Sequence, residues 1–172
     1  MRKPLFLVAV AGAALAAGAE VETTRIHFLF GWKPMGRWTS GALVGWDRPA
    51  PVIDAFGKDG QQAANITIRE PEASEVKING VTRAPDGSYA AVGTAYIRTG
   101  AAAFIWRFSA DGLLQKAIPT GAYIASAIAV VLDGMLWTAG VQKQTARLSY
   151  EDYAEDHDLI HRFTSDGRPA GS

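Results

Sequence analysis

Three segments of this chain share one short pattern, in which a phenylalanine stands three positions before an Asp-Gly pair. The phenylalanines are 52 and 55 positions apart, at Phe56, Phe108 and Phe163. A second Asp-Gly series, at residues 86–87 and 133–134, has a spacing of 47 positions. Two interleaved series of nearly equal period indicate a repeat architecture with a unit of about 50 residues.

Each Asp-Gly pair lies between two apolar or β-branched runs. Glycine supplies the positive φ that a tight hairpin requires, and aspartate tolerates the turn while its side chain bonds nearby backbone. We therefore expect a chain of hairpins with four short strands in each unit. The expected strands of the best-covered unit and the start of the next are residues 76–83, 88–96, 103–108, 113–119, 123–132 and 135–141.

Two of these expected strands contain segments, residues 89–96 and 124–132, that are apolar or small at consecutive positions. A strand with one face in water alternates between apolar and polar residues, so both segments are expected to be buried on both faces. Blades stacked around an axis bury their sheets in this way. The alternative for residues 124–132 is a buried helix, since alanine favours helix, but the flanking Gly121 and Asp133-Gly134 favour a strand.

The units resemble the delta-60 family of bacterial β-propeller repeats and, more widely, NHL-like propeller repeats. Residues 53–60 are similar to that family's opening, and residues 108–113 to its closing motif and restart. The resemblance covers about residues 51–167, although the Phe-Gly pair at 56–57 becomes Phe-Ser and Phe-Thr in the later units. It implies an all-β fold of two to three four-stranded antiparallel propeller-like blades, and it implies architecture more than activity.

The expected blades span about residues 25–68, 74–119 and 122–172, and the last of them is incomplete. In the first blade, residues 24–30 are interpreted as a strand and residues 31–38 as a loop, because the latter contain glycine and proline. A propeller ring closes with four to eight blades, and four blades need about 210 residues. Since residues 20–172 number only 153, we expect a part of a larger propeller or, less favoured, a ring completed by association.

The first 19 residues have the pattern of a secretory signal helix. Arg2 and Lys3 form the positive end, an apolar stretch follows, and Ala17-Gly18-Ala19 is a cleavage motif. A membrane anchor is the alternative, but the stretch of 16 residues is shorter than the ~20 that a spanning helix needs. We expect a secreted or periplasmic protein, residues 20–172, with no stable membrane span after signal cleavage.

Charge and cysteine content exclude several classes of function. Lys+Arg and Asp+Glu are equal at 17 each, so no net field favours nucleic acid. The chain has no cysteine, which excludes disulfides and thiolate chemistry. The expected partner is a protein, peptide or glycan.

Two groups of residues have side chains suited to binding. Trp32, Trp38 and Trp46 could stack on a sugar or peptide, although packing between sheets is the commoner role of tryptophan. Residues 151–158 hold five carboxylates and His157, which could ligate a hard cation such as Ca²⁺. They lack the spacing and the glycine of a calcium loop, so a solvated loop is the favoured interpretation.

The histidines lie in no nucleophile or metal motif. They are His27, His157 and His161. His161 shares its repeat position with Asp54 and Trp106, and a position that accepts such different residues is expected to be exposed. We therefore predict no catalytic, metal-ligating or cofactor-binding residues, and no cofactor.

These observations predict an exported, non-catalytic propeller module whose loops offer a binding or scaffold surface. One alternative is part of a propeller-type hydrolase or lyase whose active site lies in blades outside this sequence. The expected inner strands, residues 76–83 and 123–132, disfavour it because they offer only Lys77 and Arg83 as charged groups. A second alternative is a structural segment of a surface protein.

Overall fold

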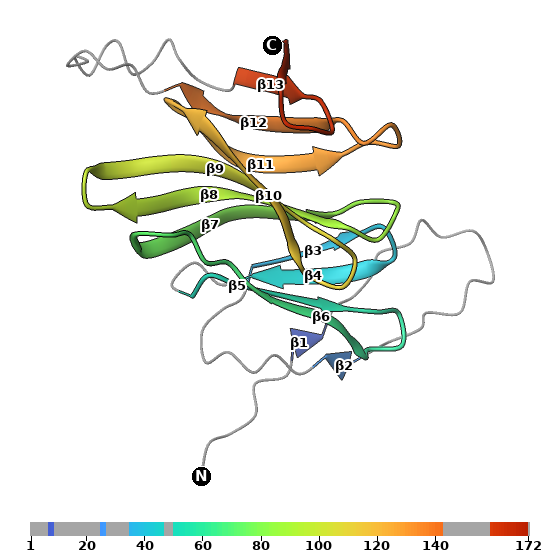
Figure 1. Cartoon of the computed structure of the whole chain (residues 1–172). Helices are drawn as coiled ribbons and strands as arrows, with labels where there is room; N and C mark the ends of the chain where they lie inside the picture. The colour runs from blue at the N-terminus through green and yellow to red at the C-terminus, as the bar shows by residue number, and fades with distance from the viewer. Residues whose placement is uncertain (1–6, 9–24, 27–34, 47–49, 143–158, 172) are drawn as a thin grey trace.

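The computed structural model describes residues 7–8, 25–26, 35–46, 50–142 and 159–171. These residues form strands and turns, and three four-stranded antiparallel sheets stack one above another (Figure 1). None of the described segments is a helix of the length and apolarity that crossing a membrane requires. The all-β class predicted from the sequence is confirmed, with three propeller-like blades.

Each sheet is a meander whose strands follow chain order. The first contains β3 (Met35–Thr39), β4 (Ala42–Trp46), β5 (Val52–Phe56) and β6 (Gln62–Thr67). The second contains β7 (Ala73–Arg83), β8 (Tyr89–Ile97), β9 (Gly100–Phe108) and β10 (Leu114–Gly121). The third contains β11 (Tyr123–Val130), β12 (Leu136–Gln142), β13 (Leu159–Phe163) and β14 (Pro169–Gly171).

The first sheet begins later than predicted. Its first strand, β3, lies largely within residues 31–38, which were predicted to be a loop. The reason is the Ser40-Gly41 turn, in which both residues have positive φ (44° and 76°), so β3 folds back directly onto β4. Serine is not a typical residue for this turn, and the hairpin was therefore missed.

The expected strand at residues 24–30 is described only at β2 (Arg25–Ile26). It pairs with β1 (Leu7–Val8) in a separate two-stranded sheet, and not with the first blade. Within the predicted signal segment, Leu7–Val8 are the described residues, and they form a strand where a helix was expected. The rest of that segment lies outside the described residues.

All five Asp-Gly pairs form the predicted hairpin turns. Each glycine has a φ between 75° and 88°, and its N–H donates to the carbonyl three residues earlier. The pattern is that of a three-residue hairpin loop that ends on a left-handed glycine. Because strands alternate in direction, these turns all lie at one end of the sheets, called here the turn end. The other end, where the chain crosses between sheets, is the crossover end.

The aspartates of these turns bond the backbone in two ways. Asp86 Oδ1 accepts the N–H and the hydroxyl of Ser88, and these hydrogen bonds lower the pKa of its carboxyl. Asp166 instead accepts the Thr164 hydroxyl, which itself accepts the Arg168 N–H. The Thr164 hydroxyl and the Arg168 guanidinium lower the pKa of Asp166 to about 2.

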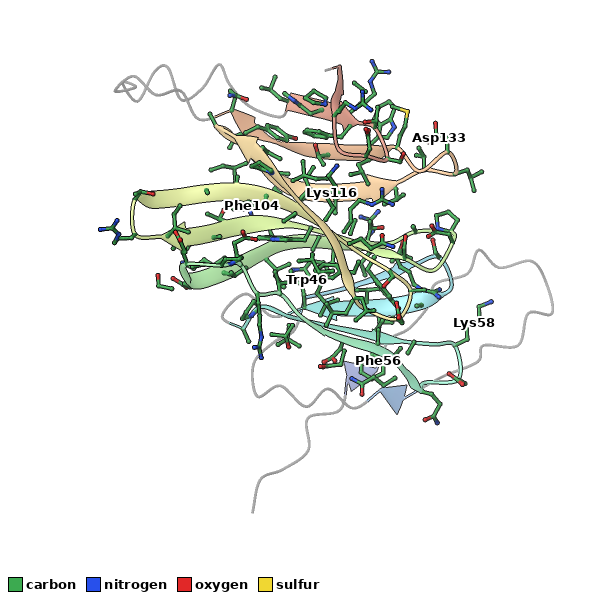
Figure 2. All side chains as sticks on the ribbon, viewed as in Figure 1. Trp46, Phe56, Lys58, Phe104, Lys116 and Asp133 are labelled. Carbon is green, nitrogen blue, oxygen red and sulfur yellow. The ribbon has the colours of Figure 1, made fainter. Side chains whose placement is uncertain are left out.

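Two apolar cores lie between the sheets, and Figure 2 shows side chains filling these spaces. The core between the first and second sheets contains Ile53, Tyr89 and Trp106. The core between the second and third sheets contains Ile105 and Leu136. The second sheet is therefore buried on both faces, as predicted for residues 89–96.

The segment predicted as strand or helix, residues 124–132, is a strand up to Val130 and then a turn. It is not buried on both faces, since Ser126 and Ala127 are exposed. The physical reason is that the third sheet packs on the second through one face, whereas its other face meets no further sheet in the described part of the chain.

Gly93 and Gly140 are required by a close approach of neighbouring strands. A Cβ at Gly93 would overlap the carbonyl oxygen of Lys77, and one at Gly140 would overlap that of Ile124. Both occur beside a register shift of the first strand in the sheet, at 78–80 in β7 and 125–127 in β11. This explains why a glycine follows the Asp-Gly pairs at 86–87 and 133–134 at the same distance.

Candidate functional site

The first strands of the three sheets lie together, and their polar side chains tie the sheets to one another. Arg37 Nη1 on β3 donates to the carbonyl of Ile128 on β11 at 3.1 Å. Asn79 Nδ2 on β7 donates to the Ala125 carbonyl of the third sheet at 3.1 Å. These side chains are used in hydrogen bonds between sheets, so the first strands stabilise the packing of the sheets against one another.

The charged residues predicted on the inner strands are also engaged. Arg83 Nη1 donates to the Ser40 carbonyl at 2.8 Å, and Lys77 Nζ lies 3.5 Å from the Glu75 carboxylate. Arg37 and Glu75 were not among the charged groups expected on the inner strands. The strand of Arg37 was predicted to be a loop, and the expected strand of the second blade began one residue after Glu75.

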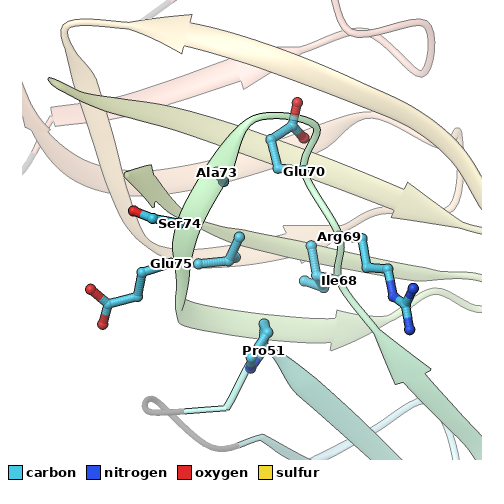
Figure 3. A pocket seen from close by; sticks show the side chains of 8 residues that line it. Pro51, Ile68, Arg69, Glu70, Ala73, Ser74 and Glu75 are labelled. Atoms are coloured by element: carbon cyan, nitrogen blue, oxygen red, sulfur yellow. The ribbon is translucent and has the colours of Figure 1, made fainter. Parts of the chain in front are cut away.

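A pocket of about 410 Å³ opens at the crossover end, where the chain passes from the first sheet to the second (Figure 3). Its volume is within the range of small-ligand sites. The Ile68 N–H donates to the Pro51 carbonyl at 2.7 Å, which fixes the crossover against the β4–β5 connection. The lining residues are Pro51, Ile68, Arg69, Glu70, Ala73, Ser74, Glu75 and Val76.

Glu70 is held in place by a tryptophan of the second sheet. Trp106 Nε1 donates to Glu70 Oε2 at 3.0 Å, and the indole ring is fully buried and stacked on Phe104 with centroids 5.5 Å apart. The Ala73 N–H donates to the Glu70 carbonyl at 3.2 Å, which closes the bend before β7. The carboxylate is thus positioned before any ligand arrives, so binding need not order it.

The remaining charges form the rim of the pocket. Figure 3 shows Arg69 and Glu75 on opposite sides, with Ile68 between them. Ile68 and Val76 are buried members of the core between the first two sheets. The pocket therefore combines an apolar floor with two carboxylates and one guanidinium.

The prediction that the shared position of Asp54, Trp106 and His161 is exposed was wrong. Asp54 and Trp106 are 2% and 0% exposed, and His161 stacks on the Tyr123 ring at 4.2 Å between centroids. Each side chain is accommodated by a different neighbour: the Asp54 carboxylate accepts Gln62 Nε2 at 2.8 Å and Asn65 Nδ2 at 2.6 Å. The residues at this position differ because each has a different partner within the protein, and not because the position is exposed to solvent.

The predicted tryptophan group is only partly described. Trp46 is buried in the core between the first and second sheets, which supports the packing role at this residue. Its Nε1 has no hydrogen-bond partner among the described residues. Trp32 and the side chain of Trp38 lie outside the described part of the chain.

The acidic loop, residues 151–158 with His157, and His27 lie outside the described residues. Within the described ranges, no three His, Asp or Glu side chains come together in a way that could hold a metal ion. The pocket at the crossover end was not predicted. Its polar residues belong to the crossover and to the start of β7, and Trp106, which positions Glu70, lies 36 positions away from it, so no local pattern links them.

No family model matches this chain, and no curated protein matches it either. Solved structures do match. One is the crystal structure of a protein of unknown function from Bacteroides caccae, with 13% identity and a TM-score of 0.50 over 98% of this chain. Another is the PQQ-bound form of aldose sugar dehydrogenase from Streptomyces coelicolor, with 20% identity and a TM-score of 0.51 over 99% of this chain.

The chain spans about half the length of these solved proteins, 57% of the first and 52% of the second. At these identities the likeness shows the fold alone. The three stacked meanders and the likeness together support a propeller-like architecture, while the specific repeat family stays a prediction.

Proposed function

We propose that this chain is an exported, non-catalytic propeller-like module that binds a peptide segment of another protein in the pocket at the crossover end. The pocket itself carries the proposal. It joins an apolar floor, Ile68 and Val76, to a carboxylate that Trp106 holds in position. Surfaces of this kind, apolar at the centre and charged at the rim, are typical of recognition sites.

The charges of the rim indicate the chemistry of the peptide. Glu75 lies beside Lys77, whereas the Glu70 carboxylate accepts a hydrogen bond from the neutral indole of Trp106, so a lysine or arginine of the ligand would find its acceptor at Glu70. An apolar side chain next to that basic residue would enter over Ile68. We therefore expect a short segment with an apolar residue beside a basic one.

The likeness to the sugar dehydrogenase does not extend this proposal to a redox reaction. That protein is described with PQQ bound, and it is 20% identical to this chain. The likeness concerns the course of the backbone, whereas a cofactor is held by particular side chains. The proposal therefore rests on the pocket.

The test is selection of a phage-displayed library of random peptides on the immobilised wild-type chain. We expect selected peptides to carry an apolar residue next to a lysine or arginine. Affinity should fall about tenfold when Glu75→Gln is combined with Glu70→Gln, the equivalent of about 1.4 kcal/mol. Glu70→Gln keeps an acceptor for Trp106, so the fold is preserved.

The matched control is Gln115→Lys on the exposed surface of β10, which raises the net charge by one unit, as the removal of a carboxylate in Glu75→Gln does. It should leave peptide affinity unchanged. If the control weakens binding as much as Glu75→Gln alone, the effect is one of net charge and the pocket is not the site. Failure to select any peptide above background would also contradict the proposal.

Export is a separate part of the proposal. We expect the protein in the extracytoplasmic fraction to begin at Glu20, after cleavage behind Ala17-Gly18-Ala19. Mass spectrometry of the intact protein from that fraction measures this. An N-terminus at Met1 in the same fraction would overturn it.

A further inference from the structure

The outer face of the third sheet, defined here by Trp137, Ile160 and Arg162, is apolar and exposed. Trp137 is 40% exposed and Ile160 is 52% exposed. The Arg162 guanidinium lies over the Trp137 ring, 5.5 Å from its centroid. Arg162 and Trp137 are also direct partners across β12 and β13, so the three side chains belong to one surface.

The second sheet carries corresponding residues on the corresponding face, and there they are covered. Ile105 and Arg107 stand two residues apart before a phenylalanine, as Ile160 and Arg162 do. Ile105 is 0% exposed, within the core shared with the third sheet. Arg107 Nη1 donates to the carbonyl of Ser165 in the β13–β14 turn of that sheet.

The first sheet repeats the arrangement once more. Ile53 is the isoleucine three residues before the phenylalanine, and it is 0% exposed in the core shared with the second sheet. In two sheets of three, this isoleucine is thus buried by the sheet that follows. Since burial of apolar surface is favourable, the half-exposed Ile160 side chain can still gain stability from a sheet that covers it.

We propose that the outer face of the third sheet docks the first sheet of a second copy of this chain. The residues that cover the second sheet include Leu136 and Phe163, which are direct partners on β12 and β13. Leu43 and Phe56 are the corresponding partners on β4 and β5 of the first sheet. The first sheet therefore has an equivalent leucine and phenylalanine that could cover the outer face of the third sheet.

The positions of the turn residues agree with this pairing. Ser165, which accepts from Arg107, stands two residues after Phe163, and Lys58 stands two residues after Phe56. By this correspondence, Arg162 would donate to the Lys58 carbonyl of the second copy.

The described residues of one copy form three four-stranded sheets. Two copies joined head to tail at both contacts would supply six sheets, within the four to eight of a closed ring. Each contact then joins two different surfaces, the third sheet of one copy and the first sheet of the other, and the ring closes after two copies.

The face of the first sheet that would dock is already buried within a single chain. Leu43 and Phe56 form a small cluster of their own and are 8% and 7% exposed within one chain. Docking would replace their present surroundings with the face of Ile160. We therefore expect association that depends on concentration in the micromolar range.

The first experiment is the mass of the chain in solution by sedimentation equilibrium. We expect a dimer whose fraction rises with concentration, and at least a tenfold larger dissociation constant for Ile160→Glu. The control Leu113→Glu makes the same change at an apolar residue that is more exposed, 66%, and lies in the turn of the second sheet. It should leave the dimer unchanged. A wild-type chain that is monomeric at every concentration, or a dimer that Ile160→Glu does not weaken, overturns the proposal.

The second experiment identifies the partner face. The chain has no cysteine, so introduced cysteines react alone. A mixture of Arg162→Cys and Lys58→Cys chains should be joined by a short thiol cross-linker. Ile160→Cys chains alone should not be joined to one another. Cross-linking of Ile160→Cys chains, without the mixed product, would show two third sheets facing each other and overturn the head-to-tail contact.

Discussion

Ile105 and Ile160 stand at the same place in two sheets of the same topology, and their surroundings differ completely. The first is 0% exposed and the second is 52% exposed. Both lie three residues before a phenylalanine and six residues before an Asp-Gly turn. The local sequence therefore determines strand and turn in both sheets, while burial depends on whether another sheet follows.

The largest expected effect concerns a close approach of strands that the second and third sheets share, at Gly93 and Gly140. Gly93→Ala would drive a methyl group into the Lys77 carbonyl, and backbone cannot yield as a flexible side chain does. We expect the free energy of unfolding to fall by about 3–5 kcal/mol, measured by urea denaturation. Gly36→Ala is the control, since its Cβ would meet neighbours at 3.7 and 3.9 Å, which is ordinary contact. A small effect of Gly93→Ala would mean that β7 can shift away.

The next largest effect is expected from the difference in burial between Ile105 and Ile160. Ile105→Ala should lower the free energy of unfolding by about 2–5 kcal/mol, because it leaves a cavity between two sheets. Ile160→Ala should cost less than about 0.5 kcal/mol in the monomer. Equal losses at low protein concentration would break the comparison, since they would mean that Ile160 is already covered in a single chain.

A smaller effect is expected at Tyr123, in the core between the second and third sheets. Its hydroxyl donates to Thr138 Oγ1 at 3.1 Å or to the Leu159 carbonyl at 3.2 Å, so Tyr123→Phe should cost about 1 kcal/mol. Burial raises the pKa of the Tyr123 hydroxyl. The neutral form is thus favoured in the fold, and its stabilisation is complete below about pH 10 and lost above it. Tyr123→Phe should remove part of the alkaline loss of stability; an unchanged alkaline profile would contradict this.

The smallest effect concerns the turns, which the sheets have in common. The pKa of Asp166 is lowered to about 2 by the Thr164 hydroxyl and the Arg168 guanidinium. Stability from this carboxylate is present above about pH 4 and lost as the pH falls toward 2. Because the carboxylate is exposed, the loss should be small. Comparing acid titrations of Asp166→Asn with those of Asp133→Asn tests it, and identical curves would contradict the assignment.

The candidate site could not have been predicted from the sequence. Glu70 lies in a short crossover with no motif, and its partner Trp106 belongs to another strand of the next sheet. The burial at the shared position of Asp54, Trp106 and His161 could not be predicted from the sequence either. Diversity there suggested exposure, yet each residue has a partner in the fold: Asn65 on the paired strand for Asp54, the Tyr123 ring of the same sheet for His161, and Glu70 of the crossover for Trp106.

The sequence alone determined the five Asp-Gly hairpins, because such a turn requires only a left-handed glycine and a side chain that bonds its own backbone. It also indicated β-structure throughout residues 52–142, since turns and apolar runs are local signals. Only the tertiary structure decided which faces are covered, that Trp106 positions Glu70 at the pocket, and that Ile160 is exposed. Those outcomes depend on contacts between residues far apart in sequence, whose energies no local pattern contains.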